Sequence, residues 1–161
     1  MDLRTERLRL VALTPGLARK AMEDREALGR SLGVRVPLAW PGMDFSRMLP
    51  TFTGSPVEPF TRLVVHAEDE TLIGEAGFNG PPDRNGTLEI GYSIIPEYRG
   101  RGFASEATRA LVEASFASPG IRRIVAESLD DNGASLRVLE KLGMRSVGSS
   151  GDTIRFELRK A

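Results

Sequence analysis

Residues 88–118 combine a strand, a glycine-rich turn and a helix, and this stretch limits what the chain can fold into. Apolar residues alternate from Leu88 to Ile94, which is typical of a β-strand. Pro96 ends that strand because proline has no N–H for a sheet ladder. Beyond the turn, apolar residues recur every three or four positions from Phe103, as on one face of a helix. The sequence therefore predicts a strand and a helix that meet at this turn.

The turn itself carries two glycines, Gly100 and Gly102, which let the backbone bend and approach a ligand closely. The first N–H groups of the following helix have no partner within it, and the helix dipole adds partial positive charge there. Arg99 and Arg101 supply further positive charge beside the turn. Together these features favour the binding of a phosphate group.

Two common phosphate-binding motifs do not match this turn. A P-loop requires Lys-Ser/Thr after its second glycine, whereas Gly102 is followed by Phe103 and Ala104. A dinucleotide fingerprint requires a third glycine at the position where this chain has Ser105. Both of these motifs are therefore excluded by the residues present.

The turn does match the acetyl-CoA signature of the GNAT N-acetyltransferases, Gln/Arg-x-x-Gly-x-Gly/Ala, at Arg99, Gly102 and Ala104. The downstream segments 132–135 and 139–144 are also similar to that family. The opening residues 3–10 resemble the first strand of the branch that includes ribosomal-protein N-terminal acetyltransferases. The resemblance covers nearly the whole chain, which is expected to form a single N-acetyltransferase domain over residues 1–161.

The resemblance implies an α/β fold with a mixed, mostly antiparallel sheet of six to seven strands and helices on both faces. The strand–helix–strand order around residues 88–128 makes its two strands parallel. In GNAT folds this parallel pair splays apart and forms the acetyl-CoA cleft. The other predicted elements are a strand at 6–13, one helix from Thr14 to Gly33, a short helix near 44–52, a hairpin at 61–78, a helix from Asn132 to Leu142 and a hairpin at 144–158. By the same resemblance, the proline-rich segment 34–59 lines the acceptor side of the cleft.

The composition argues against several kinds of binding partner and site. The net charge is zero, which argues against general binding to nucleic acid or to an anionic membrane. The chain has no cysteine and one histidine, so neither a disulfide nor a metal site is expected. Its N-terminal residues are charged, with no apolar block behind them, and we expect a cytoplasmic protein without a signal peptide.

The resemblance also implies how acetyl-CoA is held. The pyrophosphate is expected at the turn, and the pantetheine arm is expected to pair with the backbone at the end of the strand. Asn132 is expected both to cap its helix and to contribute to the cofactor site. The predicted cofactor-binding residues are Ile94, Ile95, Arg99, Gly100, Arg101, Gly102, Phe103, Ala104 and Asn132.

Acetyl transfer to an amine needs a proton acceptor for the amine and a donor for the departing thiolate. Many relatives carry a tyrosine as the donor, at a position that is Leu139 here, so Ser135 is the expected substitute. Glu89 is the expected proton acceptor and Glu75 the second candidate. Two alternatives stay open: Ser135 as an ordinary helix serine and Glu89 as a solvated strand residue. The lone His66 is expected to be a surface strand residue and not a catalytic base.

The sequence therefore predicts an acetyl-CoA-dependent N-acetyltransferase that acts on a primary amine by direct attack in a ternary complex. A protein N-terminus and a small amine are both open as acceptors, and a homodimer is an open assembly state. The alternative is a non-catalytic module with this fold that binds acyl-CoA or a partner, since the usual tyrosine is replaced by Leu139.

Overall fold

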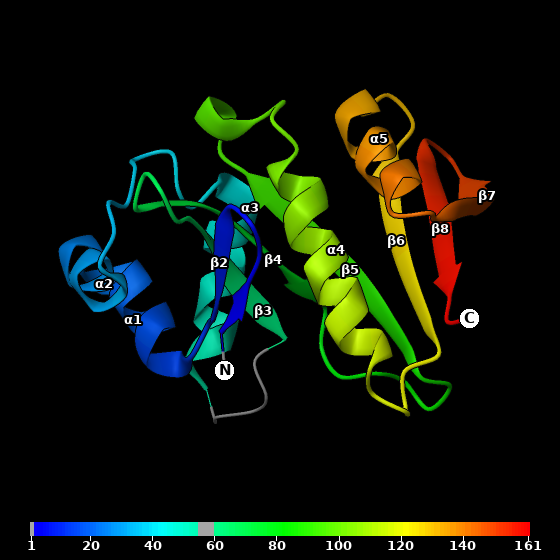
Figure 1. The fold of residues 1–161 in the computed structure, drawn as a ribbon, viewed down its shortest axis with the longest axis horizontal. Coiled ribbons are helices and arrows are strands. Elements are labelled where there is room, and N and C mark those ends of the chain that lie inside the picture. Colours follow the sequence, from blue (N-terminus) through cyan, green and yellow to red (C-terminus); the bar gives the residue numbers. More distant parts are fainter. Residues whose placement is uncertain (1, 55–59) are drawn as a thin grey trace.

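The computed structural model describes residues 2–54 and 60–161, which form a central sheet with helices on both of its faces (Figure 1). The eight strands lie in the order β1-β2-β3-β4-β5-β6-β8-β7. Their bounds are β1 Leu3–Arg4, β2 Leu8–Ala12, β3 Thr61–His66, β4 Thr71–Phe78, β5 Thr87–Ile94, β6 Arg123–Leu129, β7 Arg145–Ser150 and β8 Thr153–Arg159.

All neighbouring strands in the sheet are antiparallel except β5 and β6, which are parallel. This confirms the predicted mixed, mostly antiparallel sheet. The sheet is one strand wider than the predicted upper bound because Leu3–Arg4 forms a separate short strand, β1, that pairs with β2.

The helices lie on opposite faces of the sheet, with α4 across the face toward the viewer in Figure 1 and α3 behind the strands. α4 buries Phe103, Ala107 and Leu111, the face that the apolar spacing predicts. The α-helices are α1 Pro15–Glu23, α2 Arg25–Leu32, α3 Met43–Met48, α4 Phe103–Phe116 and α5 Gly133–Lys141, and two 3₁₀ turns span Leu49–Thr53 and Pro96–Tyr98.

The prediction of one helix from Thr14 to Gly33 is wrong, because Asp24 divides it into α1 and α2. The backbone of Asp24 leaves the helical region, at φ −151° and ψ 89°. Its N–H closes α1 on the carbonyl of Lys20, and its carboxylate accepts a hydrogen bond from the N–H of Ala27, which caps α2. The aspartate thus ends one helix and begins the next.

The short helix predicted near 44–52 is α3 followed by a 3₁₀ turn. The end of the proline-rich segment, with Pro56 and Pro59, lies outside the described residues. Among the described residues, no helix has both the length and the apolar character needed to cross a bilayer.

The parallel pairing of β5 and β6 is short. It joins Thr87–Glu89 only to Arg123–Val125, although β5 continues to Ile94 and β6 to Leu129. Beyond Glu89 the two strands separate, as the resemblance implied. The separation leaves part of the β5 backbone without a partner strand on that side.

The β5 backbone groups that face the gap can be assigned from the hydrogen bonds on its other side. The N–H of Asn79 donates to Glu89 O, and the N–H of Ile95 donates to Ile73 O of β4. Because successive residues of a strand direct their N–H and C=O groups to opposite sides, the groups of Tyr92 and Ile94 point toward β6. They lie where a ligand could replace the missing strand.

Candidate active site

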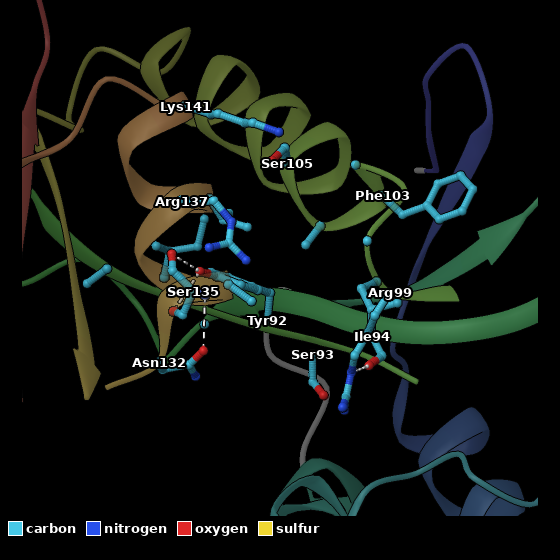
Figure 2. A pocket seen from close by; sticks show the side chains of 18 of the residues that line it. Tyr92, Ser93, Ile94, Arg99, Phe103, Ser105, Asn132, Ser135, Arg137 and Lys141 are labelled. Carbon is cyan, nitrogen blue, oxygen red and sulfur yellow. Dashed lines mark hydrogen bonds between the residues drawn. The ribbon is translucent and has the colours of Figure 1, made fainter. Parts of the chain in front are cut away.

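A cleft of about 680 Å³ lies where β5 and β6 separate (Figure 2). It is walled by the end of β5, the glycine-rich turn, the first turn of α4, and α5. Most of the predicted site residues come together in this cleft: Ile94, Arg99, Gly100, Gly102, Phe103, Ala104, Asn132 and Ser135.

The glycine-rich turn has the backbone conformation that only glycine adopts easily. Gly100 and Gly102 have φ values of 76° and 82°. Gly102 is the N-cap of α4, and no side chain of the described residues caps that helix. The N–H groups of its first turn are therefore available for an anion in the cleft.

The turn is fastened to the N-terminal segment of the chain through Glu106 in the first turn of α4. Glu106 accepts hydrogen bonds from the Thr5 hydroxyl and from the Arg7 backbone N–H and Nε, the last at 2.7 Å. Arg7 also donates to the carbonyl of Arg101 at 3.0 Å. Burial alone would raise the pKa of Glu106, but these hydrogen bonds outweigh it and hold the pKa below its ordinary value.

The two arginines of the turn differ in their surroundings. Arg99 lines the cleft and donates from Nε to the carbonyl of Ile94 at 2.7 Å (Figure 2). Arg101 lies over the ring of Tyr98 at 4.6 Å and donates to the carbonyl of Glu97, and it does not line the cleft. Ile95 does not line the cleft either, and its backbone N–H donates to the carbonyl of Ile73 on β4.

The hydroxyl groups of Tyr92 on β5 and Ser135 on α5 form a pair on the cleft wall opposite the glycine-rich turn. Asn132 accepts a hydrogen bond from the N–H of Ser135 at 3.1 Å, which confirms its predicted role as the cap of α5. The Tyr92 hydroxyl lies 3.0 Å from Ser135 Oγ (Figure 2). Burial raises the pKa of Tyr92, against a smaller opposing effect of the hydrogen bond to Ser135, so the phenol stays protonated at neutral pH.

Tyr92 is not among the site residues predicted from the sequence, because the family pattern places its tyrosine on α5, at the position of Leu139. Leu139 is buried in the core, and the phenol comes instead from the strand across the cleft. The signal was present in the alternation of β5, which places Tyr92 on the same face as Ile90 and Ile94.

A second cavity, of about 430 Å³, lies beside the first and shares Gly91, Tyr92, Ser93 and Arg99 with it. It is bounded by β4, β5 and α3. The buried carboxyl of Glu75, on β4, lines this cavity and accepts a hydrogen bond from Trp40 Nε1 at 3.0 Å. Burial raises the pKa of Glu75 to about 7, and the hydrogen bond from Trp40 opposes that rise.

The expected proton acceptor, Glu89, is exposed and is not among the residues that line either of these cavities. Glu75, the second candidate, lines the smaller cavity beside the cleft. The expectation that His66 lies on the surface is wrong, because the N-terminal end of α4 covers it. His66 is 8% exposed and packs edge-on against Phe103, with ring centroids 5.0 Å apart.

The described residues contain no group of three or more His, Asp or Glu side chains that could hold a metal ion. The arrangement instead suits an elongated anionic ligand. The uncapped N-terminus of α4 and the part of β5 without a partner strand lie along one cleft, and the smaller cavity with the Glu75 carboxyl adjoins it.

Residues 7–145 match the family described as the acetyltransferase (GNAT) domain. The chain belongs to the GNAT acetyltransferase family. The uncharacterized N-acetyltransferase YjdG of Bacillus subtilis (strain 168) is 32% identical over an alignment of 148 residues that covers 88% of each chain. The name of this relative and that of the family both refer to acetyl transfer.

Solved structures of GNAT proteins share the fold. An acetyltransferase from Bacillus anthracis superimposes with a TM-score of 0.70 at 21% identity, over 99% of both chains. The ribosomal-protein-S5-alanine acetyltransferase of Vibrio fischeri superimposes with a TM-score of 0.68 at 18% identity, over 99% of this chain and 97% of that one. The predicted likeness to the ribosomal-protein branch is thus found in the fold.

Proposed function

We propose that this GNAT protein transfers the acetyl group of acetyl-CoA to a primary amine by direct attack within a ternary complex. The observation that carries the proposal is the meeting of two cavities at one stretch of β5. The larger has an anion site at one end, the smaller holds a buried carboxyl, and both are lined by Tyr92 and Ser93. Two substrates could therefore lie side by side without sharing space.

The larger cleft is the proposed site of acetyl-CoA. Its pyrophosphate would be bound by the free N–H groups at the start of α4, with Arg99 adding charge. The pantetheine arm would pair with the backbone of Tyr92 and Ile94, which points into the gap between β5 and β6. Bound there, acetyl-CoA supplies an activated acyl group as its thioester.

The chain's own groups then have separate tasks. A free backbone N–H at the end of β5 can stabilise the oxyanion that forms as the amine attacks the thioester carbon. The hydroxyls of Tyr92 and Ser135 lie together on the wall of the cleft and can donate to the departing sulfur. The proposal therefore assigns Ser135 the donor role expected from the sequence, with Tyr92 as its partner.

The acceptor is proposed to be a primary amine, carried either by a small molecule or by a protein N-terminus. The ribosomal-protein-S5-alanine acetyltransferase of Vibrio fischeri supports the second possibility through its fold alone. The smaller cavity, at about 430 Å³, has room for a small molecule or for one terminal residue.

The test is calorimetric titration with acetyl-CoA, followed by measurement of free thiol released in the presence of small amines and N-terminal peptides. Binding with amine-dependent thiol release supports the proposal. Binding without release on any acceptor favours the non-catalytic alternative, and no binding overturns the assignment of the cleft.

A further inference from the structure

Glu75 is a buried carboxyl whose position calls for an explanation. Its side chain comes from the middle of β4, and the residue is 6% exposed. A carboxyl buried in this way costs free energy when it is charged. Yet Glu75 lines an open cavity, and across the sheet it is paired in register with Ser93, which lines both cavities.

The carboxyl is held by a residue that is itself fixed. Trp40 is 1% exposed and donates from Nε1 to Glu75 at 3.0 Å. The Trp40 ring packs on Phe45 with centroids 6.1 Å apart, and its carbonyl accepts a hydrogen bond from Arg25 at 2.6 Å. One carboxylate oxygen is therefore anchored by a rigid donor, which positions the other relative to the cavity.

The rest of the cavity has a consistent chemical character. One wall is α3, which contributes Met43, Phe45 and Met48. Met43 and Met48 are 73% and 43% exposed, so both place apolar surface at the cavity. An occupant with a compact apolar group would cover this surface.

We propose that Glu75 takes the proton from the acceptor amine, and that the acceptor is a primary amine attached to a compact apolar group that packs against α3. This inference rests on the proposed acetyltransferase function and adds to it a proton acceptor and a class of acceptor. Trp40 is a positioning residue, because it acts through Glu75.

The acceptor enters as an ammonium ion, and one proton passes to Glu75, which frees the nitrogen lone pair. That pair forms a bond to the thioester carbon, and the carbonyl electrons move to oxygen. When the C=O bond forms again, the C–S bond breaks and its electron pair leaves on sulfur. Tyr92 and Ser135 give the sulfur a proton and regain it from solvent, which also receives the remaining nitrogen proton and the one on Glu75.

The first test is Glu75→Gln, which keeps the size of the side chain and an oxygen for Trp40 but cannot accept the proton. We expect kcat to fall by about 100-fold or more while the affinity for acetyl-CoA is retained. The matched control is Glu68→Gln, which removes an exposed carboxylate in the turn between β3 and β4 and is expected to keep the wild-type rate.

The second test separates a positioning role from a merely structural one. Trp40→Phe keeps an aromatic ring but removes the donor that favours ionised Glu75. The acid limb of the kcat/KM profile should then move to higher pH, by about one pH unit. The other titratable or charged side chains that line this cavity are Asp44, Tyr92 and Arg99. A lower rate with an unmoved limb would overturn the positioning role.

The acceptor class is tested with 2-phenylethylamine, which has one ammonium group on an apolar body, against spermidine, which has several positive charges. We expect a higher kcat/KM for 2-phenylethylamine, and Phe45→Ala should raise its KM. A preference for spermidine would overturn the apolar acceptor class.

The outcomes distinguish this inference from the proposed function. If the unaltered protein releases thiol with none of the amines or peptides, both are overturned. If it releases thiol and Glu75→Gln keeps the rate, only the role of Glu75 is overturned. If Glu89→Gln loses the rate instead, the proton acceptor is Glu89, as first expected from the sequence.

Discussion

Burial of Glu75 predicts a specific dependence of stability on pH. Its pKa rises from 4.5 to about 7 in the folded chain, mainly because burial disfavours the charged form. Each tenfold change in proton affinity is worth about 1.4 kcal/mol, so folding carries a cost of about 3 kcal/mol when Glu75 is ionised in the unfolded chain.

The direction of the effect follows from the raised pKa. Below about pH 4.5 the carboxyl is protonated in both states and the cost is absent. As the pH rises toward about 7, the unfolded chain loses the proton and the folded chain keeps it, so stability falls. Above that range both states are ionised and the full cost remains. Glu75→Gln cannot ionise and should escape this loss.

The assay is urea unfolding of the wild type and of Glu75→Gln between about pH 4 and pH 8. The difference between their free energies of unfolding should move by about 3 kcal/mol in favour of the variant as the pH rises. Taking this difference cancels the other titrating groups. Glu68→Gln should show no such trend. A Glu75→Gln difference that stays constant over this range would refute the argument from burial.

Three further changes test other parts of the site. Gly102→Val should reduce acetyl-CoA affinity by about 100-fold or more in calorimetry, because valine resists the positive φ of 82° and would crowd the anion site; unchanged affinity would contradict the assignment of the turn. Tyr92→Phe combined with Ser135→Ala should lower kcat more than Ser135→Ala alone in thiol-release assays, because the two hydroxyls form one donor pair; equal rates would remove Tyr92 from the reaction. Glu106→Gln should lower the melting temperature at neutral pH. This loss should shrink below the ordinary carboxyl pKa, because the folded state depresses the pKa of Glu106; a loss that is independent of pH would contradict that cause.

The parts of the fold that could be predicted are those set by local chemistry. The glycine-rich turn, α4 and the strand before it follow from residues close together in the chain. The division at Asp24 could not be predicted, because an aspartate within an apolar periodic stretch is also common on the exposed side of one continuous helix.

In the site, the sequence could not show which of two glutamates lies at the cavity. Glu89 and Glu75 lie on the same face of the sheet, because Glu75 is paired with Ser93, which shares that face with Glu89. Glu89 is four residues from Ser93, a separation of about 13 Å along a strand. Alternation therefore predicts the face of the sheet on which a carboxyl lies. Which carboxyl on that face lies beside α3 depends instead on the packing of distant segments.

The contact between Tyr92 and Ser135 has a similar origin. The two residues are 43 positions apart in the sequence, and each lies on an element whose own pattern says nothing about the other. Only the separation of β5 from β6 brings the phenol and the helix serine to one cleft.

The separation of β5 from β6 also leaves few interactions between the two halves of the sheet. β5 and β6 share a ladder of only three residue pairs, and other hydrogen bonds between the two sides include those of Tyr92 with Ser135, of Arg123 with Thr87, and of Arg109 on α4 with the carbonyl of Lys141. A ligand arm bonded to the β5 backbone and touching α5 would tie the two sides together. Bound acetyl-CoA would then hold the two halves of the sheet together, so that they separate less often. Amide hydrogens in β6 would therefore exchange more slowly in the bound protein.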